Sequence, residues 1–250
     1  MASSFAYRDG LVWVKVEVAG ASRPLNFVLD SGAGATVISI DAASRLGLKL
    51  GGSETVAGVS GRCAARHVEH FAANLCGQPL AKSILALDLS DVGRGCHQPI
   101  DGLVGADFFQ HRVVQIDFAA SELRLLDRAD ATRGEVLPVK TLNGAMCVPV
   151  SVGGERPRWT RLDTGCTDAL VWVKSNRTQA SATGKAIALS AAAGKCVPMD
   201  IQIGRRKLTA VPTSLHAREI FPAEAGLLGS GVLSKFRVTV DGQGHRVVIE

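Results

Sequence analysis

The sequence predicts an all-β protein built from two similar lobes. Two observations carry this prediction: runs of alternating apolar and polar residues recur along the chain, and one short motif occurs twice. Leu29-Asp30-Ser31-Gly32 and Leu162-Asp163-Thr164-Gly165 place their aspartates 133 residues apart. The 250 residues, 46% of them hydrophobic and 20% charged, are sufficient for a globular protein with a sizeable core.

The similarity between the two halves extends beyond the motif. The same offset of 133 residues pairs Gly20 with Gly153, Arg23-Pro24 with Arg156-Pro157, and Cys63 with Cys196. Two apolar residues and a glycine form a second anchor in each half, Leu103-Val104-Gly105 and Leu227-Leu228-Gly229, and an aspartate follows each glycine by twelve residues, at Asp117 and Asp241. We therefore predict the same order of elements in each half: hairpin, aspartate motif, hairpin, apolar anchor, hairpin.

The elements of the first half are predicted in the following order. Residues 11–18 alternate between apolar and polar, and a turn at 20–24 leads into a strand over 25–29 that delivers Asp30. A strand over 36–40 comes next, followed by a short helix over 41–47 that we expect Asp41 to cap and Gly47 to stop. The period of two at 113–118 and 123–126 predicts a closing hairpin.

The second half repeats this order. Strands over 146–152 and 158–162, joined by a turn at 153–157, deliver Asp163, and a strand over 169–173 follows. A closing hairpin is predicted over 236–240 and 246–249. Residues 127–138 have the composition of a linker, so we place the boundary near Gly134, with lobes 1–133 and 134–250. Halves of this size favour two lobes packed across a pseudo-two-fold axis between the aspartates.

Two such motifs that meet at an axis form a site for acid–base chemistry. Gly32 and Gly165 let the two loops turn sharply and approach, and the hydroxyls of Ser31 and Thr164 can bond across to the opposite loop. Two carboxylates about 3 Å apart cannot both ionise, so the pair shares one proton. One carboxylate takes a proton from water, which attacks an amide carbonyl, while the other protonates the carbonyl oxygen. No cofactor is needed.

Phe27-Val28-Leu29-Asp30-Ser31-Gly32-Ala33 followed by Leu103-Val104-Gly105 resembles a lobe of the aspartic proteases of the pepsin and retropepsin class. The motif and anchor of the second half resemble the other lobe, so the resemblance covers residues 11–250. It implies a bilobal acid protease fold and an aspartic endopeptidase that acts on polypeptides, with Asp30 and Asp163 as catalytic dyad. Each half has roughly the length of a retropepsin, which implies a monomer acting as a pseudo-dimer.

The residue after each motif glycine departs from the pepsin pattern. Many pepsin-like enzymes have a serine or threonine there, whereas this chain has Ala33 and Cys166. Because alanine donates no hydrogen bond and a thiol only a weak one, the ionised dyad loses stabilisation and its pKa values rise. We expect an activity optimum less acidic than that of a pepsin.

The resemblance also implies a flap, a β-hairpin that covers the substrate. Residues 56–63 occupy the matching position, and its tip residues are Gly58, Val59, Ser60 and Gly61. Glycines at a tip suit a lid that opens. The corresponding hairpin of the second half, expected over 189–198, is either a second flap or part of the packing of its lobe.

Other interpretations of the chain have less support from its residues. The fold can persist as a catalytically weak or inactive peptide-binding or inhibitory module, although both motifs are complete here. The cysteines and histidines at Cys63, His67, His70 and Cys76 invite a zinc site, but their spacing is unsuitable and no metal is predicted. Cys166 is interpreted as a small packed side chain rather than a nucleophile, and disulfide pairing of the six cysteines is left open.

Charge and hydropathy restrict the partners. The formal net charge is +5, but the basic residues are scattered and Arg205-Arg206-Lys207 is better explained as a solvated hairpin turn than as a nucleic-acid site. No apolar run approaches the roughly 18 residues that a membrane span requires. Residues 1–7 lack the features of a signal peptide. We expect a soluble protein, with a periplasmic or secreted location favoured if an upstream signal has been removed.

Overall fold

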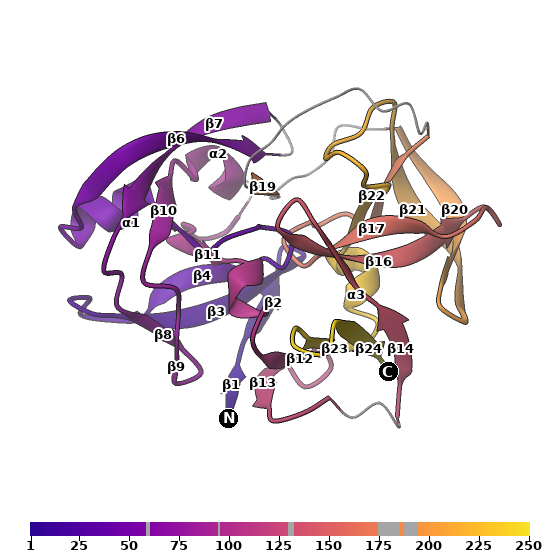
Figure 1. The fold of residues 1–250 in the computed structure, drawn as a ribbon, viewed down its shortest axis with the longest axis horizontal. Helices are drawn as coiled ribbons and strands as arrows, with labels where there is room; N and C mark the ends of the chain where they lie inside the picture. The colour runs from indigo at the N-terminus through magenta and orange to yellow at the C-terminus, as the bar shows by residue number, and fades with distance from the viewer. Residues whose placement is uncertain (59–60, 95, 130–132, 175–185, 188–194) are drawn as a thin grey trace.

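The computed structural model describes residues 1–58, 61–94, 96–129, 133–174, 186–187 and 195–250. Within these residues almost every element is a strand, so the predicted all-β class is confirmed. The first half forms the lobe on the left of Figure 1 and the second half the lobe on the right, with a further sheet below and between them. The bilobal arrangement is therefore also confirmed.

The first lobe is built on one large sheet, in which β11 (Gly102–Val104) lies between β4 (Leu25–Leu29) and β5 (Val37–Ser39) and is parallel to β4. In strand β3 (Leu11–Val18), exposed Lys15 and Glu17 alternate with buried valines, as the period-two pattern predicted. In chain order the strands are β2 (Ala6–Arg8), β3 (Leu11–Val18), β4 (Leu25–Leu29), β5 (Val37–Ser39), β6 (Leu50–Gly58), β7 (Gly61–Val68), β8 (Ala73–Leu75), β9 (Gln78–Pro79), β10 (Ile84–Leu87), β11 (Gly102–Val104) and, from the second half, β19 (Ala186–Ile187), which pairs with β6.

The second lobe has its own sheet, in which β22 lies between β17 and β18 and is parallel to β17. This is the arrangement that β11 has with β4 and β5. Because β16 pairs with both β17 and β20, the sheet closes on itself. Its strands are β15 (Lys140–Leu142), β16 (Ala145–Val152), β17 (Arg158–Asp163), β18 (Leu170–Val173), β20 (Lys195–Ile203), β21 (Arg206–His216) and β22 (Gly226–Gly229).

A third sheet joins the two halves, and both chain termini lie at it in Figure 1. Its central pair is formed by β12 and β23, one from each half, with Ile116 opposite Val238. In spatial order the strands are β1 (Ala2–Ser4), β13 (Glu122–Leu126), β12 (Val113–Asp117), β23 (Arg237–Asp241), β24 (Arg246–Ile249) and β14 (Glu135–Pro138). We call it the shared sheet.

The helices of the described residues are short: α1 (Ile40–Arg45), α2 (Ser90–Gly93), the 3-10 turn η1 (Ala106–Phe108) and α3 (Ser230–Leu233). The expected cap of α1 was wrong. Ser39, not Asp41, is the N-cap, because its Oγ accepts the backbone N–H of Ala42 at 3.0 Å, while Asp41 lies in the first turn. The predicted stop is confirmed, since Gly47 follows the helix with a φ of +65°.

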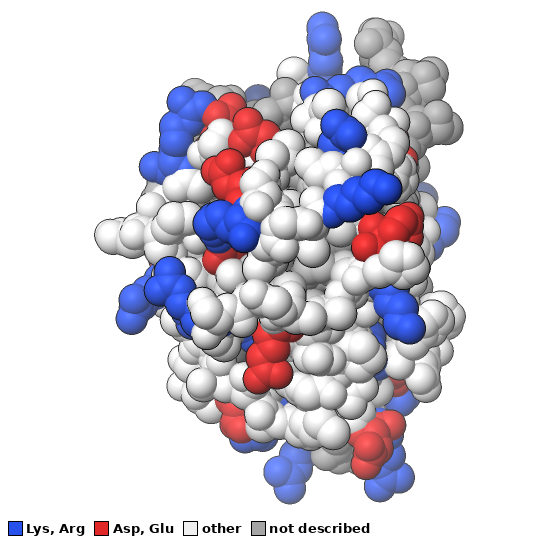
Figure 2. All heavy atoms as spheres, turned by 90° about the vertical axis from the view of Figure 1, so that its left-hand side faces the viewer, with Lys and Arg blue, Asp and Glu red and all other residues white. Residues whose placement is uncertain are grey.

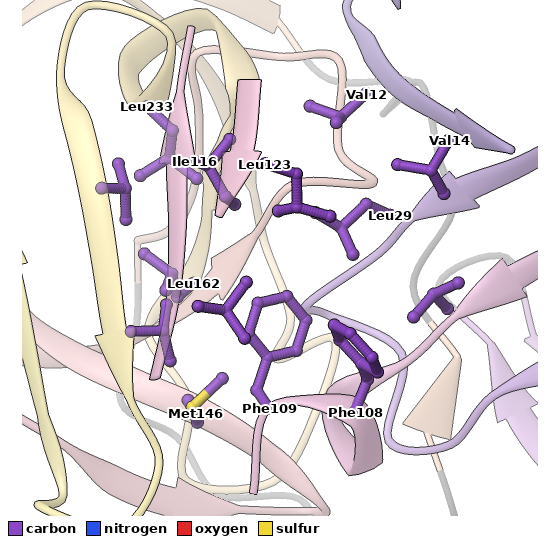
Figure 3. Close-up of a cluster of buried hydrophobic side chains, with 14 of the residues drawn as sticks. Val12, Val14, Leu29, Phe108, Phe109, Ile116, Leu123, Met146, Leu162 and Leu233 are labelled. Carbon is purple, nitrogen blue, oxygen red and sulfur yellow. The ribbon is translucent and has the colours of Figure 1, made fainter. Parts of the chain in front are cut away.

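One hydrophobic core runs through both lobes and the shared sheet. Figure 3 shows Leu29 of the first lobe and Leu162 of the second in the same cluster as Phe109, Ile116 and Leu233. All five side chains are buried. The strands that end at the two aspartates are therefore anchored in a common core, which restricts how far one can move relative to the other.

One expectation about a connecting segment was wrong: the end of the expected linker, Glu135–Pro138, is strand β14, which pairs with β24. Of the hairpin expected over 189–198, Lys195–Pro198 belongs to strand β20, which pairs with β21, and residues 189–194 lie outside the described residues. The division of the lobes near Gly134 stays a prediction.

Charges of both signs are interspersed over the face of the molecule shown in Figure 2, which carries no extended basic surface. The Arg205–Lys207 triplet is exposed at the turn between β20 and β21.

All six cysteines are free thiols in this structure. Across the described ranges, no helix has the length and apolar character to cross a bilayer.

Candidate active site

Asp30 and Asp163 occupy the same place in the two lobes. Asp30 follows β4 and donates its backbone N–H to Val104 O of β11 at 2.9 Å. Asp163 is the last residue of β17 and lies opposite Gly229 at the end of β22. The parallel pairing of each aspartate strand with its apolar anchor therefore directs both side chains to the junction of the lobes. Neither side chain is exposed to solvent.

The two hydroxyl residues that follow the aspartates hold the loops together. Ser31 Oγ donates to Leu162 O at 2.7 Å and accepts the backbone N–H of Thr164 at 3.1 Å. Reciprocally, Thr164 Oγ1 donates to Leu29 O at 2.6 Å and accepts the backbone N–H of Ser31 at 3.0 Å. Each hydroxyl thus uses its donor and one acceptor across the junction, and together they fix the relative position of the two loops.

The glycine of each motif faces the carboxyl group of the other. A β-carbon at position 32 would lie 2.3 Å from Cγ of Asp163, and one at position 165 would lie 2.5 Å from Cγ of Asp30. Since neither glycine has a positive φ, backbone conformation alone does not require glycine here. The opposite carboxyl group occupies the space that a side chain would need, so it is this close approach that excludes every larger residue.

Backbone N–H groups bind one oxygen of each carboxyl group. Gly32 and Ala33 donate to Asp30 Oδ1 at 3.0 and 2.9 Å, and Gly165 donates to Asp163 Oδ1 at 3.0 Å. The other oxygen, Oδ2, is buried on both aspartates and accepts no hydrogen bond from a donor group of the described residues. A buried carboxyl oxygen without a partner is costly unless it is protonated or binds something from outside the protein.

Both carboxyl groups have a raised pKa. Burial is the main cause for each, because it disfavours the charged form, and the charge of Asp163 raises the pKa of Asp30 further. The backbone donors and the positive charge of Arg161 act in the opposite direction on both groups. Burial outweighs these, so the pair keeps a proton to a higher pH than a solvated aspartate would.

The apolar anchors support the loops from behind. Ala106 donates to Ala33 O at 2.7 Å, and Ser230 donates to Cys166 O at 2.8 Å. The anchor glycine preceding each donor packs against backbone: a β-carbon at position 105 would lie 2.3 Å from the carbonyl carbon of Ala35. Cys166 is fully buried, and burial raises the pKa of its thiol well above the usual value. A neutral, inaccessible thiol is no nucleophile, in agreement with its predicted role as a packed side chain.

The predicted flap is a hairpin of β6 and β7. Val56 pairs with Cys63 and Gly58 with Gly61, so the two strands stay in register up to the residues that flank the tip. Val59 and Ser60 lie outside the described residues. Strand β6 pairs with β7 on one side and with β19 of the second half on the other, so at this edge the flap sheet is joined by a segment from the opposite half.

The residues of the suggested zinc site do not gather. Cys63 is exposed on β7, and Nε2 of His67 on the same strand lies 4.0 Å from Oε2 of Glu54. In the part of the chain that the structure describes, no three histidine, cysteine, aspartate or glutamate side chains are grouped so as to hold a metal ion.

Arg161 is the residue of this site that the sequence analysis missed. It is fully buried, forms an ion pair with Glu224 at 2.5 Å, and donates to the backbone oxygen of Gly32 at 2.6 Å. Strand β17 was recognised, but Arg161 was not singled out, because an arginine in a strand suggests a solvated position. The available signal was its spacing: it lies two residues before Asp163 and therefore on the same face of the strand.

Comparison with known proteins supports the interpretation of the first lobe. The family model described as aspartyl protease matches residues 14–108, a range that contains Asp30-Ser31-Gly32 and the anchor ending at Gly105. A search of curated proteins found no match. The chain is thus similar to an aspartyl protease family over this part of its first half.

Proposed function

We propose that this protein is an aspartic endopeptidase in which Asp30 and Asp163 share one proton and activate a water molecule. The observation that carries the proposal is the pair of buried Oδ2 atoms, one on each aspartate, that accept no hydrogen bond from a donor group of the described residues. A water molecule bound between them would satisfy both. The halves divided near Gly134 would then act as a pseudo-dimer within one monomer, with a polypeptide as substrate.

The proposed reaction follows from the protonation of the pair. The ionised carboxylate takes a proton from water, and the oxygen of that water attacks the carbonyl carbon of the peptide bond. The protonated carboxyl group gives its proton to the carbonyl oxygen as the carbon becomes tetrahedral. Collapse of this intermediate, with a proton delivered to the amide nitrogen, breaks the C–N bond. Ser31, Thr164 and the two motif glycines keep the carboxyl groups in place throughout.

The proposed pH optimum is less acidic than that of a pepsin. Activity requires one proton on the pair, so raised pKa values move the active range to higher pH. Two features support this direction: burial raises the pKa of both carboxyl groups, and Ala33 and Cys166 lack a hydroxyl that would stabilise the charge. The measurement is kcat/KM as a function of pH, and a maximum below about pH 3 would contradict the proposal.

Substitution of either aspartate tests the dyad. We expect Asp30→Asn and Asp163→Asn each to lower the hydrolysis of a peptide library by about 100-fold or more, because general acid–base catalysis contributes about 10²–10⁴-fold. A statine-type inhibitor should suppress wild-type cleavage. Asp41→Asn, which changes an exposed carboxylate on α1, is the matched control and should leave cleavage unchanged.

The outcomes separate this proposal from its alternative. Cleavage that survives either dyad substitution would exclude the assigned dyad. Peptide binding without cleavage from acid to neutral pH, in correctly folded wild-type protein, would instead indicate a peptide-binding or inhibitory module.

A further inference from the structure

A buried ion pair lies directly behind the two aspartates. Arg161 and Glu224 are 0% and 1% exposed at their side chains. Burying two charges carries a large desolvation cost, and apolar residues of similar volume often replace such a pair without loss of stability. The corresponding position of the first half, 133 residues earlier, is the buried Val28, so the fold itself does not require a charge at this point.

The guanidinium group of Arg161 is held in one orientation. Its Nε and Nη2 donate to Glu224 Oε2 and Oε1 at 2.7 and 2.5 Å, which is the two-pronged geometry of a strong arginine–carboxylate pair. Its Cζ lies 3.8 Å from the centre of the Phe221 ring. Glu224 is fixed in turn, because Asn143 Nδ2 donates to its Oε1 at 2.8 Å. The guanidinium group of Arg161 is therefore held in place by its ion pair with Glu224 and by stacking on Phe221.

The remaining contact of Arg161 leads across the lobe junction to the other aspartate loop. Nη1 donates to the backbone oxygen of Gly32 at 2.6 Å, and Gly32 is the residue whose Cα faces the carboxyl group of Asp163. Asp163 lies two residues after Arg161 on the same face of β17. Arg161 thus lies on the same strand face as Asp163 and is hydrogen-bonded to the loop that carries Asp30.

We propose that Arg161, held by Glu224, is a positioning residue of the dyad, which fixes the Asp30 loop through Gly32 O and favours the singly ionised state by its positive charge. The inference rests on the proposed protease function and deepens it. Consistent with it, the charge of Arg161 lowers the pKa of both Asp30 and Asp163.

The other titratable groups around the pair do not supply this charge. Each aspartate faces the other, and the Cys166 thiol, whose pKa burial raises well above the usual value, stays neutral. Asp168, which acts on Cys166, and Glu224 are acidic. Arg161 is the cation among the charged groups that influence both aspartates.

The test compares variants of Arg161 in the full-length protein. Arg161→Met combined with Glu224→Gln removes both charges, so that no unpaired glutamate remains buried. We expect both apparent pKa values of the dyad to rise by about one unit, since an adjacent arginine lowers an aspartate pKa by about 1–3 units. The pH profile of kcat/KM should shift upward with them, and kcat/KM at its maximum should fall about 10-fold or more because the Gly32 loop is released.

Two further variants separate positioning from general stability. Arg161→Lys restores a positive charge but not the forked hydrogen bonds, and we expect it to return the pH profile toward that of the wild type while kcat stays reduced. Arg237→Met is the matched control: Arg237 lies in the shared sheet and pairs with Asp117 at 2.7 Å and Glu250 at 3.1 Å. It should lower the melting temperature without moving the pH profile.

A second readout keeps the inference independent of catalysis. Carbon-13 NMR of aspartate carboxyl groups, assigned with Asp30→Asn and Asp163→Asn, follows the titration of the dyad even in a protein that cleaves nothing. Absence of cleavage by the wild type would overturn the proposed function alone. Dyad titrations that coincide in the wild type and in the folded double variant would overturn the role of Arg161. If this double variant does not fold, Arg161→Gln combined with Glu224→Gln, which retains an uncharged donor at position 161 and leaves no unpaired glutamate, serves for the same comparison with the same two outcomes.

Discussion

At the scale of single residues, the close approach of the two loops explains the composition of the site better than backbone conformation does. Ser31 and Thr164 exchange hydrogen bonds with the backbone of the opposite loop, and Gly32 and Gly165 leave room for the opposite carboxyl group. Each of these residues is therefore required by a residue that lies 131 or more positions away in the chain.

Substitution of a motif glycine tests this explanation. We expect Gly32→Ala to lower kcat/KM by about 100-fold, since a displacement of about 1 Å at a catalytic group has an effect of that size. It should also destabilise the fold by about 1–3 kcal/mol, because the new methyl group overpacks a site without free space.

Gly52→Ala is the control for this prediction, because Gly52 lies on β6 with a φ that is not positive and with no atom within 4 Å of an added β-carbon. Its activity and melting temperature should match those of the wild type. Equal effects of the two substitutions would show that crowding by the Asp163 carboxyl group is not the reason for glycine at position 32.

Sequence reasoning found the residues of the site that a motif carries and missed the one that no motif carries. Asp30 and Asp163 were found because the same four-residue pattern occurs twice. Arg161 was missed because its ion-pair partner is 63 positions away and its other contact lies in the opposite half. A burial pattern cannot identify a buried cation before its partners are known.

At the scale of elements, local signals were reliable where a strand's own residues determine its environment. Strands β3, β4, β16 and β17 could be read from their apolar residues and from the turn residues that join them, which are local features of the chain. Segments stabilised by distant partners were misread. Glu135–Pro138 ends a longer segment, residues 127–138, whose composition is typical of a linker, yet these four residues form a strand because β24, more than 100 residues later, offers an edge.

Helix α1 also has one end that the local sequence determines and one end that distant contacts determine. Its existence and its end at Gly47 could be read from the sequence, whereas its first residue could not. Ser39 and Asp41 are both good capping residues, and the choice between them depends on where β5 ends. Because β5 pairs with β10 and β11, tertiary contacts set the start of the helix.

At the scale of the whole molecule, the shared sheet and the common core make the two lobes one unit. The central strands β12 and β23 come from different halves, and buried Gln115 and Thr239 are hydrogen-bonded across them at 3.0 Å. Neither lobe can lose this sheet alone without exposing the apolar side chains that Figure 3 shows between them. We therefore expect the two halves to unfold together.

Tryptophan fluorescence can test this prediction, because each lobe contains a buried tryptophan, Trp13 in β3 and Trp172 in β18. One variant retains only Trp13 and the other only Trp172, with phenylalanine at the remaining tryptophan positions. Urea and thermal transitions of the two variants, each compared with its own circular dichroism, should coincide within a variant and share one cooperative step. Two separated steps in a single variant would show that the lobes unfold independently.

The sequence by itself determined the all-β class, the hairpins, and the matching positions of Asp30 and Asp163 in the two halves, because alternation and a repeated motif are local properties. Only the tertiary structure decided why glycine stands at positions 32 and 165, which strand follows the lobe boundary, and that a buried arginine adjoins both aspartate loops. The physical reason is common to all three. Each depends on the space, edge or charge offered by a segment far away in the chain, and such a partner exists only after the lobes have packed together.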